Sequence, residues 1–280
     1  MNALEIENLT KVFPGFRLGE ISFALPSGCI MGLIGENGAG KSTTIKLILG
    51  MLRKDGGSIR ILGRDNEENI AQIKEDVGVV LDEAGFPDCL TPKQIGKVMG
   101  RTFKRWDEGA YKAYLARFDL PENKPFKALS RGMKMKLSIA VALSHGSKLL
   151  LLDEPTSGLD PVARDEVVTI LNEFTRDEDH SVLISSHIVS DLEKLCDYVA
   201  FLHRGKLLLW EEKDRLLGEY GILHCTASEL ACLSQGAVTH KKETPYGVEA
   251  LVKRSAVPAG MGVSPVSIEE LFVYMAKEAV

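Results

Sequence analysis

The sequence predicts an α/β fold built on a mainly parallel β-sheet. Short, continuous apolar segments alternate along the chain with segments of helical periodicity, which is the pattern of strands joined by helices on the faces of a sheet. The apolar segments at 29–34 and 149–152 show no polar alternation, as expected of strands buried on both faces. A third observation is a glycine-rich loop that follows the first of these segments and precedes a helical one. The chain has 280 residues, 45% hydrophobic and 26% charged, which excludes disorder, collagen-like repeats and a coiled-coil rod.

The elements follow from local patterns. The first two strands alternate apolar and polar residues on either side of the Pro14-Gly15 turn, and we expect them to form an antiparallel flank. A helix should cover residues 43–52, because Ile45, Ile48, Leu49 and Leu52 recur at helical spacing. Residues 73–81 should pass from the end of a helix into a strand. The other expected strands and helices lie at 58–63, 148–153, 165–174, 181–186 and 189–197, with a hairpin at 198–209.

Changes in composition suggest how these elements are divided. Residues 1–217 should form one domain, and its basic, aromatic-rich segment at about 88–145 should be an inserted helical subdomain. Residues 218–280 alternate short strand and helix patterns and read as a small α/β accessory region. The segment SIEELFVYMAKE, at 267–278, should close the chain as a helix.

Several classes of protein are disfavoured. No apolar run reaches the 18 or so residues that a membrane helix needs. The acidic start MNALEIENLT shows no secretory signal, and the five scattered cysteines contain no CxxC pair, so we expect reduced thiols in a cytosolic protein. The net charge of −5 argues against general nucleic-acid binding, and we expect no nucleic-acid partner.

The strongest local signal is the glycine-rich loop, which runs from Gly35 to Thr43 and matches G-x-x-x-x-G-K-[ST]. In such a loop, glycines let the backbone amides curl around phosphate oxygens, and the following helix N-terminus adds partial positive charge. Lys41 would contact the β- and γ-phosphates, and the Ser42 hydroxyl would coordinate Mg²⁺. The loop residues proposed to bind nucleotide are Gly35, Asn37, Gly38, Gly40, Lys41, Ser42 and Thr43.

Two acidic residues end a later apolar strand. Asp153 follows four leucines, and the carboxyl end of a parallel strand points into the crevice where ligands bind. Asp153 would therefore hold Mg²⁺ through a water molecule. Glu154 is adjacent and turned differently, so its carboxylate is a candidate general base for in-line attack by water.

These segments together resemble the ATP-binding subunit of an ABC transporter, most closely the bacterial exporters of antibiotics or peptides. The loop at 35–43 resembles Walker A, LSRGM at 129–133 the ABC signature, and LLLLDE at 149–154 Walker B. SGLD at 157–160 resembles the D-loop, and His187 the switch histidine. The resemblance covers about residues 1–217 and implies a P-loop NTPase fold that uses ATP and Mg²⁺.

The resemblance also implies a mechanism and partners. Two nucleotide domains would close head to tail around two ATP molecules, so that Ser130 and the Gly132 amide meet the γ-phosphate bound by the partner. Asp160 would cross that interface, and His187 would position the attacking water. The subunit would pair with a second copy or a different ATPase, work with separate transmembrane chains, and lie at the cytoplasmic face of the cell membrane through them. Its substrate would be a peptide, an antibiotic or a lipid-like molecule.

Four positions depart from the family pattern. Asp82 stands where the family usually has Gln, and we carry the position over as a Mg²⁺ ligand acting through water. Arg131 stands in the signature where glycine is commonest, and Met133 where Gln is commonest. Phe13 occupies the place of the aromatic residue that stacks on adenine, and Phe16 competes for that role.

Other functions remain as alternatives. A non-transport ABC ATPase acting on ribosomes usually carries two nucleotide domains, whereas this chain has one set of motifs. A DNA-repair or chromosome ATPase would need a long coiled-coil insertion between Walker A and the signature, and a purely regulatory nucleotide-binding protein would not need both Glu154 and His187.

Charge is unevenly distributed along the chain. The segment from Thr91 to Lys136 carries twelve basic and four acidic residues, a net charge of +8 against −13 for the remainder. A division of this size suggests an acidic partner surface, either loops of the membrane subunit or anionic lipid head groups; the alternative is a solvated basic helical face with no partner.

Overall fold

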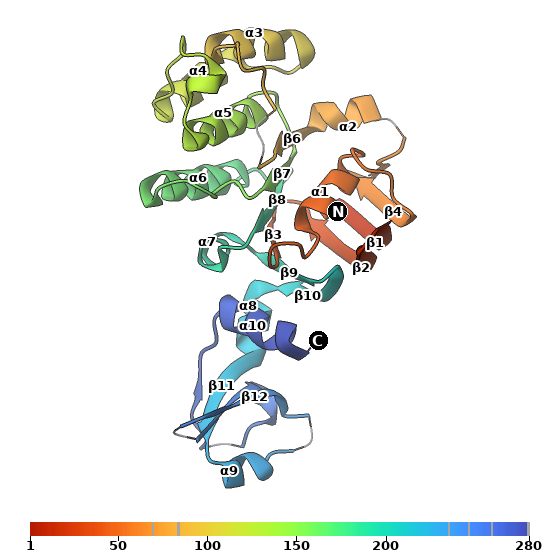
Figure 1. Ribbon diagram of the computed structural model, residues 1–280, viewed down its shortest axis with the longest axis vertical. Helices are drawn as coiled ribbons and strands as arrows, with labels where there is room; N and C mark the ends of the chain where they lie inside the picture. The colour runs from red at the N-terminus through yellow and green to blue at the C-terminus, as the bar shows by residue number, and fades with distance from the viewer. Residues whose placement is uncertain (69, 83–84, 235, 246, 259, 279–280) are drawn as a thin grey trace.

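The computed structural model describes residues 1–280 except 69, 83–84, 235, 246, 259 and 279–280 (Figure 1). A central sheet lies between a helical subdomain at one end of the long axis and a smaller α/β region at the other. The strands are β1 (Asn2–Phe13), β2 (Phe16–Pro26), β3 (Ile30–Ile34), β4 (Gly56–Ile61), β5 (Arg64–Asp65), β6 (Val77–Val80), β7 (Leu149–Asp153), β8 (Ser181–Ser186), β9 (Tyr198–His203), β10 (Lys206–Glu212), β11 (Tyr220–Cys225), β12 (Val238–Thr244), β13 (Gly247–Lys253) and β14 (Val263–Ser264).

The helices include those predicted from the sequence, in the predicted order. They are α1 (Lys41–Ile48), α2 (Ile70–Asp76), α3 (Pro92–Thr102), α4 (Glu108–Arg117), α5 (Arg131–Leu143), α6 (Pro161–Phe174), α7 (Val189–Leu195), α8 (Lys213–Glu219), α9 (Ala227–Ala231) and α10 (Ile268–Glu278), with 3₁₀ turns at Phe126–Ala128 and Arg254–Ala256. The C-terminal end of α1 differs from the prediction, since the helix stops at Ile48 rather than near Leu52. Leu49 caps it, and Gly50 then adopts a φ of +66° that a continuing helix does not allow.

The central sheet has six strands in the order β10-β9-β3-β8-β7-β6. All neighbours pair in parallel except β10, which runs antiparallel to β9 as the second arm of the predicted hairpin. Every residue of β3, β7 and β8 is buried, so their continuous apolar character reflects packing on both faces. The mainly parallel sheet is therefore confirmed.

The predicted antiparallel flank is a separate four-stranded sheet in the order β2-β1-β4-β5. Its apolar face packs, together with α1, against one face of the central sheet, and the residues buried there include Leu4, Leu25, Met31 and Leu151. The helical subdomain consists of α3, α4 and α5 and lies near the edge of the central sheet that β6 forms (Figure 1).

Side chains cap the helices of this subdomain. Thr91 and Gln94 form a reciprocal capping box at α3, Asp107 caps α4, and Ser130 caps α5. Tyr111 is almost fully buried between these helices, and its hydroxyl donates a hydrogen bond of 2.8 Å to the Pro92 carbonyl oxygen. Its burial raises the pKa of the Tyr111 phenol, which therefore stays protonated and donating.

A two-arginine clamp joins the subdomain to the rest of the domain. The Asp76 carboxylate, at the end of α2, accepts hydrogen bonds from Arg105 at 2.6 Å and from Arg64 at 2.8 Å. Arg105 also donates to the Glu75 carbonyl oxygen at 2.7 Å. Because Arg64 belongs to the flank and Arg105 to the loop between α3 and α4, one carboxylate ties three parts of the chain together.

The accessory region is less separate than the sequence suggests. It contains a four-stranded sheet in the order β12-β13-β11-β14, but α8 runs across the expected boundary at 217–218. The final helix α10 packs against α7 of the first domain. The Phe272 ring meets the Phe201 ring edge-on with centroids 5.5 Å apart, and Leu271 is fully buried in a cluster that continues into the central sheet.

The five cysteines are all free. Among the described residues, we find no helix that combines the length and the apolar character needed to cross a membrane.

The shared core predicts that the C-terminal helix stabilises the first domain. We expect Leu271→Ala to lower the free energy of unfolding by about 2–5 kcal/mol, because it leaves a cavity in the buried cluster that α10 shares with the central sheet. Val273→Ala is the matched control, since Val273 lies on the same helix and is 42% exposed, and we expect a change within about 0.5 kcal/mol. Both are measured by urea unfolding followed through fluorescence. An unchanged midpoint for Leu271→Ala would show that the two parts unfold independently.

Candidate active site

A cavity of about 550 Å³ opens at the carboxyl ends of β3, β7 and β8. It is lined by residues that follow these strands, together with Phe16 of β2 and Asp82 after β6: Phe16, Glu36, Asn37, Gly38, Gly40, Lys41, Ser42, Thr43, Asp82, Glu154, Ser157 and His187. Most of the predicted loop residues, the predicted base and the predicted histidine therefore meet in one place.

Glycine is required at two points of the loop. Gly40 has a φ of +110° and forms the N-terminal cap of α1, which directs the first free amides of the helix into the cavity. Gly35 does not line the cavity. A side chain there would collide with the Leu202 carbonyl oxygen of the neighbouring strand β9, so Gly35 allows the loop to pass close to the sheet.

Lys41 stands at the base of the loop. Its side chain is only 5% exposed, and its Nζ donates to the carbonyl oxygens of Gly35 at 2.8 Å and Glu36 at 3.3 Å. The same nitrogen lies 3.2 Å from the Glu154 Oε1 atom. A buried ammonium needs such partners, and an anionic phosphate can take the place of the carboxylate.

Glu154 owes its position to a left-handed backbone. Its φ is +53°, which is uncommon for a residue other than glycine and costs roughly 1–2 kcal/mol. Its N–H bonds with Ser185, reaching the carbonyl oxygen at 3.1 Å and the hydroxyl at 3.2 Å, and these contacts hold the turn. The chain thereby leaves β7 with the Glu154 carboxylate aimed at Lys41 and away from Asp153.

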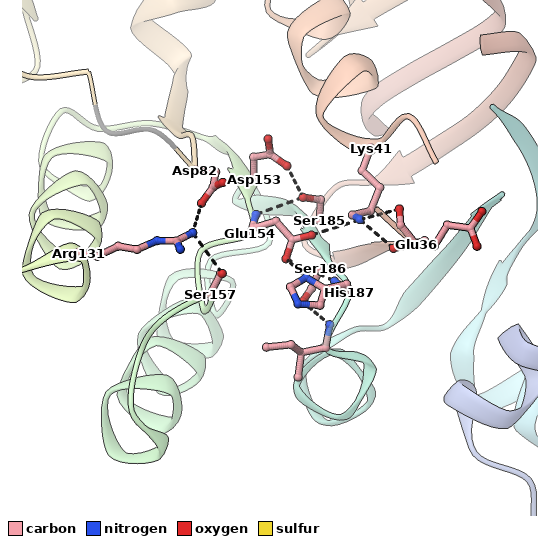
Figure 2. A network of polar contacts seen from close by, with 12 residues as sticks. Glu36, Lys41, Asp82, Arg131, Asp153, Glu154, Ser157, Ser185, Ser186 and His187 are labelled. Atoms are coloured by element: carbon pink, nitrogen blue, oxygen red, sulfur yellow. Dashed lines mark hydrogen bonds and ion pairs between the residues drawn. The ribbon is translucent and has the colours of Figure 1, made fainter. Parts of the chain in front are cut away.

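His187 completes this group. It follows β8 directly, and its Nδ1 lies 2.7 Å from the Glu154 Oε2 atom, as Figure 2 shows. The His187 backbone N–H donates to the same oxygen at 3.4 Å. The Glu154 carboxylate thus stands between a buried cation on one side and an imidazole, 45% exposed, on the other.

Oxygen donors suited to Mg²⁺ lie around the same cavity. Asp153 is 3% exposed and accepts a 2.6 Å hydrogen bond from the Ser185 hydroxyl, which orients its carboxylate. Ser42 and Asp82 line the cavity itself. Within the described part of the chain, no three His, Cys, Asp or Glu side chains gather as a metal cluster. Such a donor set fits Mg²⁺, which uses one or two protein oxygens and completes its octahedron with phosphates and water.

Asp82 has a partner that the sequence did not reveal. Its Oδ1 lies 2.6 Å from the Arg131 Nη2 atom, and that nitrogen also donates to the Ser157 hydroxyl at 3.3 Å. Asp82 and Arg131, two of the departures from the family pattern, are 49 positions apart and in contact.

A second cavity, of about 480 Å³, gathers the signature and D-loop residues. Ser130, Gly132 and Asp160 line it, together with Arg131 and Lys136. Ser130 caps α5, its Oγ accepting a hydrogen bond from the Met133 N–H at 3.2 Å, so its hydroxyl hydrogen stays available to a ligand. Asp160 caps α6, and its hydrogen bond from the Ala163 N–H lowers the pKa of this carboxyl, which keeps it ionised.

The two aromatic candidates lie side by side at the β1–β2 turn, with ring centroids 6.4 Å apart. Among the described residues, Phe16 lines the nucleotide cavity and Phe13 does not. Phe13 instead lies beneath Lys11, whose Nζ is 5.6 Å from the ring centroid.

Ser185 is the functional residue that sequence reasoning missed. It orients Asp153 and also fixes the Glu154 turn. Its signal was a serine directly after the apolar residues 182–184 of a strand expected to be buried, where a polar group needs a partner.

Comparisons with known proteins agree with this geometry. The family model described as ABC transporter matches residues 18–157. The lantibiotic transport ATP-binding protein SrtF of Streptococcus pyogenes is 37% identical over 75% of this chain and 91% of that protein. The bacitracin transport ATP-binding protein BcrA of Enterococcus faecalis is 34% identical over 73% of this chain and 68% of that protein. A solved ATP-binding subunit of an ABC transporter superposes with a TM-score of 0.70 and 27% identity, covering 76% of this chain and 91% of that structure.

The chain belongs to the ABC transporter family. It has the P-loop NTPase fold of that family's ATP-binding subunits, as the sequence predicted, and like them it binds and hydrolyses ATP.

The position of the two phenylalanines predicts which one stacks on the adenine. We expect Phe16→Ala to lose about 1–3 kcal/mol of nucleotide binding, the usual contribution of an aromatic side chain to stacking on a base. The dissociation constant should rise at least about fivefold. Phe13→Ala is the matched control and should change it little. Titration with a fluorescent ATP analogue measures both, and a larger loss for Phe13→Ala would return the role to Phe13.

Proposed function

We propose that this chain is the ATP-hydrolysing subunit of an exporter whose membrane domains are separate chains. The observation that carries the proposal is the Glu154 carboxylate held between Lys41 and His187 at the mouth of the phosphate-binding loop. Relatives named for lantibiotic and bacitracin transport support export of a peptide, an antibiotic or a lipid-like molecule. The subunit would act at the cytoplasmic face of the membrane, attached through its partners.

In this proposal Lys41 changes partner when ATP binds. Its Nζ lies 3.2 Å from the Glu154 carboxylate in the structure. The β- and γ-phosphates carry more negative charge and would draw the ammonium away, leaving Glu154 bonded to His187. Glu154 then serves as the general base that accepts a proton from the attacking water, and His187 holds the carboxylate and water in place.

Ser42 and Asp153 would hold Mg²⁺ beside the phosphates, with Asp82 as a further oxygen donor. The ion would supply positive charge that offsets the negative charge of the β- and γ-phosphates while the γ-phosphoryl group is transferred to water. Asp153 suits this task because the Ser185 hydroxyl already fixes its orientation.

The second cavity supports a head-to-tail pair of subunits. Ser130 and the Gly132 amide lie at the N-terminal end of the 13-residue helix α5, and the Asp160 carboxylate lies beside them. A phosphate bound by a partner subunit would meet both the hydroxyl donor and the helix end. Ser130, Arg131 and Asp160 in this lining are polar and exposed, as residues that meet a partner's phosphate need to be.

An apolar groove of about 420 Å³ is the proposed site for the membrane subunit. It runs between α1, α2 and Phe103, and two large apolar side chains are exposed along it, Met51 at 57% and Ile70 at 44%. The adjoining helix α3 presents Lys97 and Arg101 one turn apart, both exposed. An acidic, partly apolar segment of a membrane subunit would complement this surface.

The first test removes the proposed base. We expect Glu154→Gln to bind ATP and to hydrolyse it about 10²–10⁴-fold more slowly, because the amide keeps the shape and cannot accept the proton. Glu36→Gln is the matched control, since Glu36 also lines the cavity but lies 3.0 Å from His203 and should leave hydrolysis near that of the wild type. Phosphate release measures both. Hydrolysis by Glu154→Gln at the wild-type rate would contradict the assignment.

Lys41→Ala should fail at an earlier step. Deleting the ammonium removes the charge-assisted hydrogen bonds to the β- and γ-phosphates, so we expect nucleotide binding itself to weaken by about tenfold or more. Equilibrium binding of a fluorescent ATP analogue distinguishes this loss from that of Glu154→Gln. Equal affinity for Lys41→Ala and the wild type would be the contradicting result.

The basic face of α3 predicts a salt-sensitive attachment. Reversing Lys97 and Arg101 to Glu should cost about 1 kcal/mol or more per cation and weaken attachment to membranes roughly thirtyfold at low salt. Lys124→Glu with Lys127→Glu is the control, reversing two exposed cations elsewhere in the subdomain. Arg105 is left unchanged because it holds Asp76 at 2.6 Å.

The measurement is sedimentation with washed membranes that contain the transporter, compared with protein-free anionic vesicles. A loss confined to the transporter membranes supports docking on the membrane subunit. An equal loss on both would assign the charge to lipid, and no loss on either would leave the basic face without a partner.

A further inference from the structure

The ion pair between Arg131 and Asp82 joins the two cavities of the subunit. Asp82 follows β6. Both Asp82 and Ser157 line the nucleotide cavity. Arg131 is the first residue of α5 and lines the signature cavity. Its Nη2 atom reaches Asp82 at 2.6 Å and Ser157 at 3.3 Å, so the guanidinium lies on the boundary between the two sites (Figure 2).

A nearby anion stabilises the guanidinium of Arg131 at this position. A cation in the first turn of a helix is unfavourable, because the helix N-terminus carries partial positive charge. The guanidinium cannot lose its proton to relieve this. Asp82 supplies the compensating charge in the single chain, yet the two side chains are 47% and 59% exposed, so solvent keeps their attraction weak.

We propose that Arg131 exchanges Asp82 for a phosphate oxygen of the ATP bound to a second copy of the chain. The inference rests on the head-to-tail pairing in the proposed function. In the free subunit the pair holds Arg131 toward its own nucleotide cavity, and in the closed dimer Arg131 turns to the partner's nucleotide. The chain thus carries a competing contact that opposes closure until ATP is present on the facing subunit.

Two features favour exchange over a fixed structural link. Ser130 and Gly132, the neighbours of Arg131, are the groups expected to meet the partner's phosphate, so the guanidinium needs only a change of side-chain direction. A guanidinium also matches phosphate oxygens in geometry, and a phosphate carries more charge than a single carboxylate. When Arg131 departs, the Asp82 oxygen becomes free to face its own nucleotide cavity.

The proposal predicts opposite effects from the two halves of the pair. In the slow Glu154→Gln background, Asp82→Asn weakens the competing contact, and ATP-driven dimerisation should become about two- to fivefold tighter. Arg131→Met loses the contact with the partner's phosphate at both sites of the dimer, and dimerisation should weaken at least about tenfold. The double variant should behave like Arg131→Met. Lys127→Met, an exposed cation shortly before the signature, is the control and should change nothing.

Sedimentation velocity over an ATP titration measures dimerisation, and a fluorescent ATP analogue measures binding to each chain. A structural ion pair would make both variants shift in the same direction, and that result, or no shift in either, overturns the exchange. If the Glu154→Gln protein binds no ATP, the proposed function itself fails. If it binds ATP and stays monomeric at every concentration, pairing with a second copy fails and the exchange fails with it.

Discussion

The parallel pairing of β3, β7 and β8 is the constraint on which the site depends. Ile34 is opposite Ser186, and Asp153 is opposite Ser185, so three strands end at one edge of the sheet and their next residues enter one cavity. Burial on both faces fixes this register, because a slip of one residue would exchange the side chains that face the two layers. This strand register is sufficient to bring the phosphate loop, the acidic pair and His187 together.

The same register brings opposite charges together at a cost. Lys41 and Glu154 are 5% and 12% exposed, and burying either charge alone would be expensive. Each charge compensates the other, and the left-handed turn at Glu154 is retained by its two bonds to Ser185. If Glu154 accepts a proton from water, Lys41 needs another anionic partner, and a phosphate group would supply that charge.

Local patterns in the sequence were enough to predict the sheet, the loop and the Asp153-Glu154 pair. Each depends on neighbours within one turn or one strand. The contact between Asp82 and Arg131 could not be predicted, since 49 positions separate them and no periodicity relates a strand end to a helix start. Phe13 and Phe16 pair across the β1–β2 turn, and only the twist of that hairpin decides which ring reaches the cavity. The boundary at 217–218 was predicted from a change in composition. Composition carries no information on the packing of α10 against the first domain.

That return of α10 links the accessory region to the site through packing. His187 is followed almost at once by α7, and α10 packs against α7 while Phe272 reaches Phe201 in β9. The other face of α10 is tied to the accessory sheet, where the Tyr274 hydroxyl donates to Glu249 at 2.5 Å. The helix that follows His187 therefore contacts both β3 of the central sheet and α10 of the accessory region. A close-packed interior transmits displacement more readily than it absorbs it, so packing connects the accessory region to the helix directly after His187.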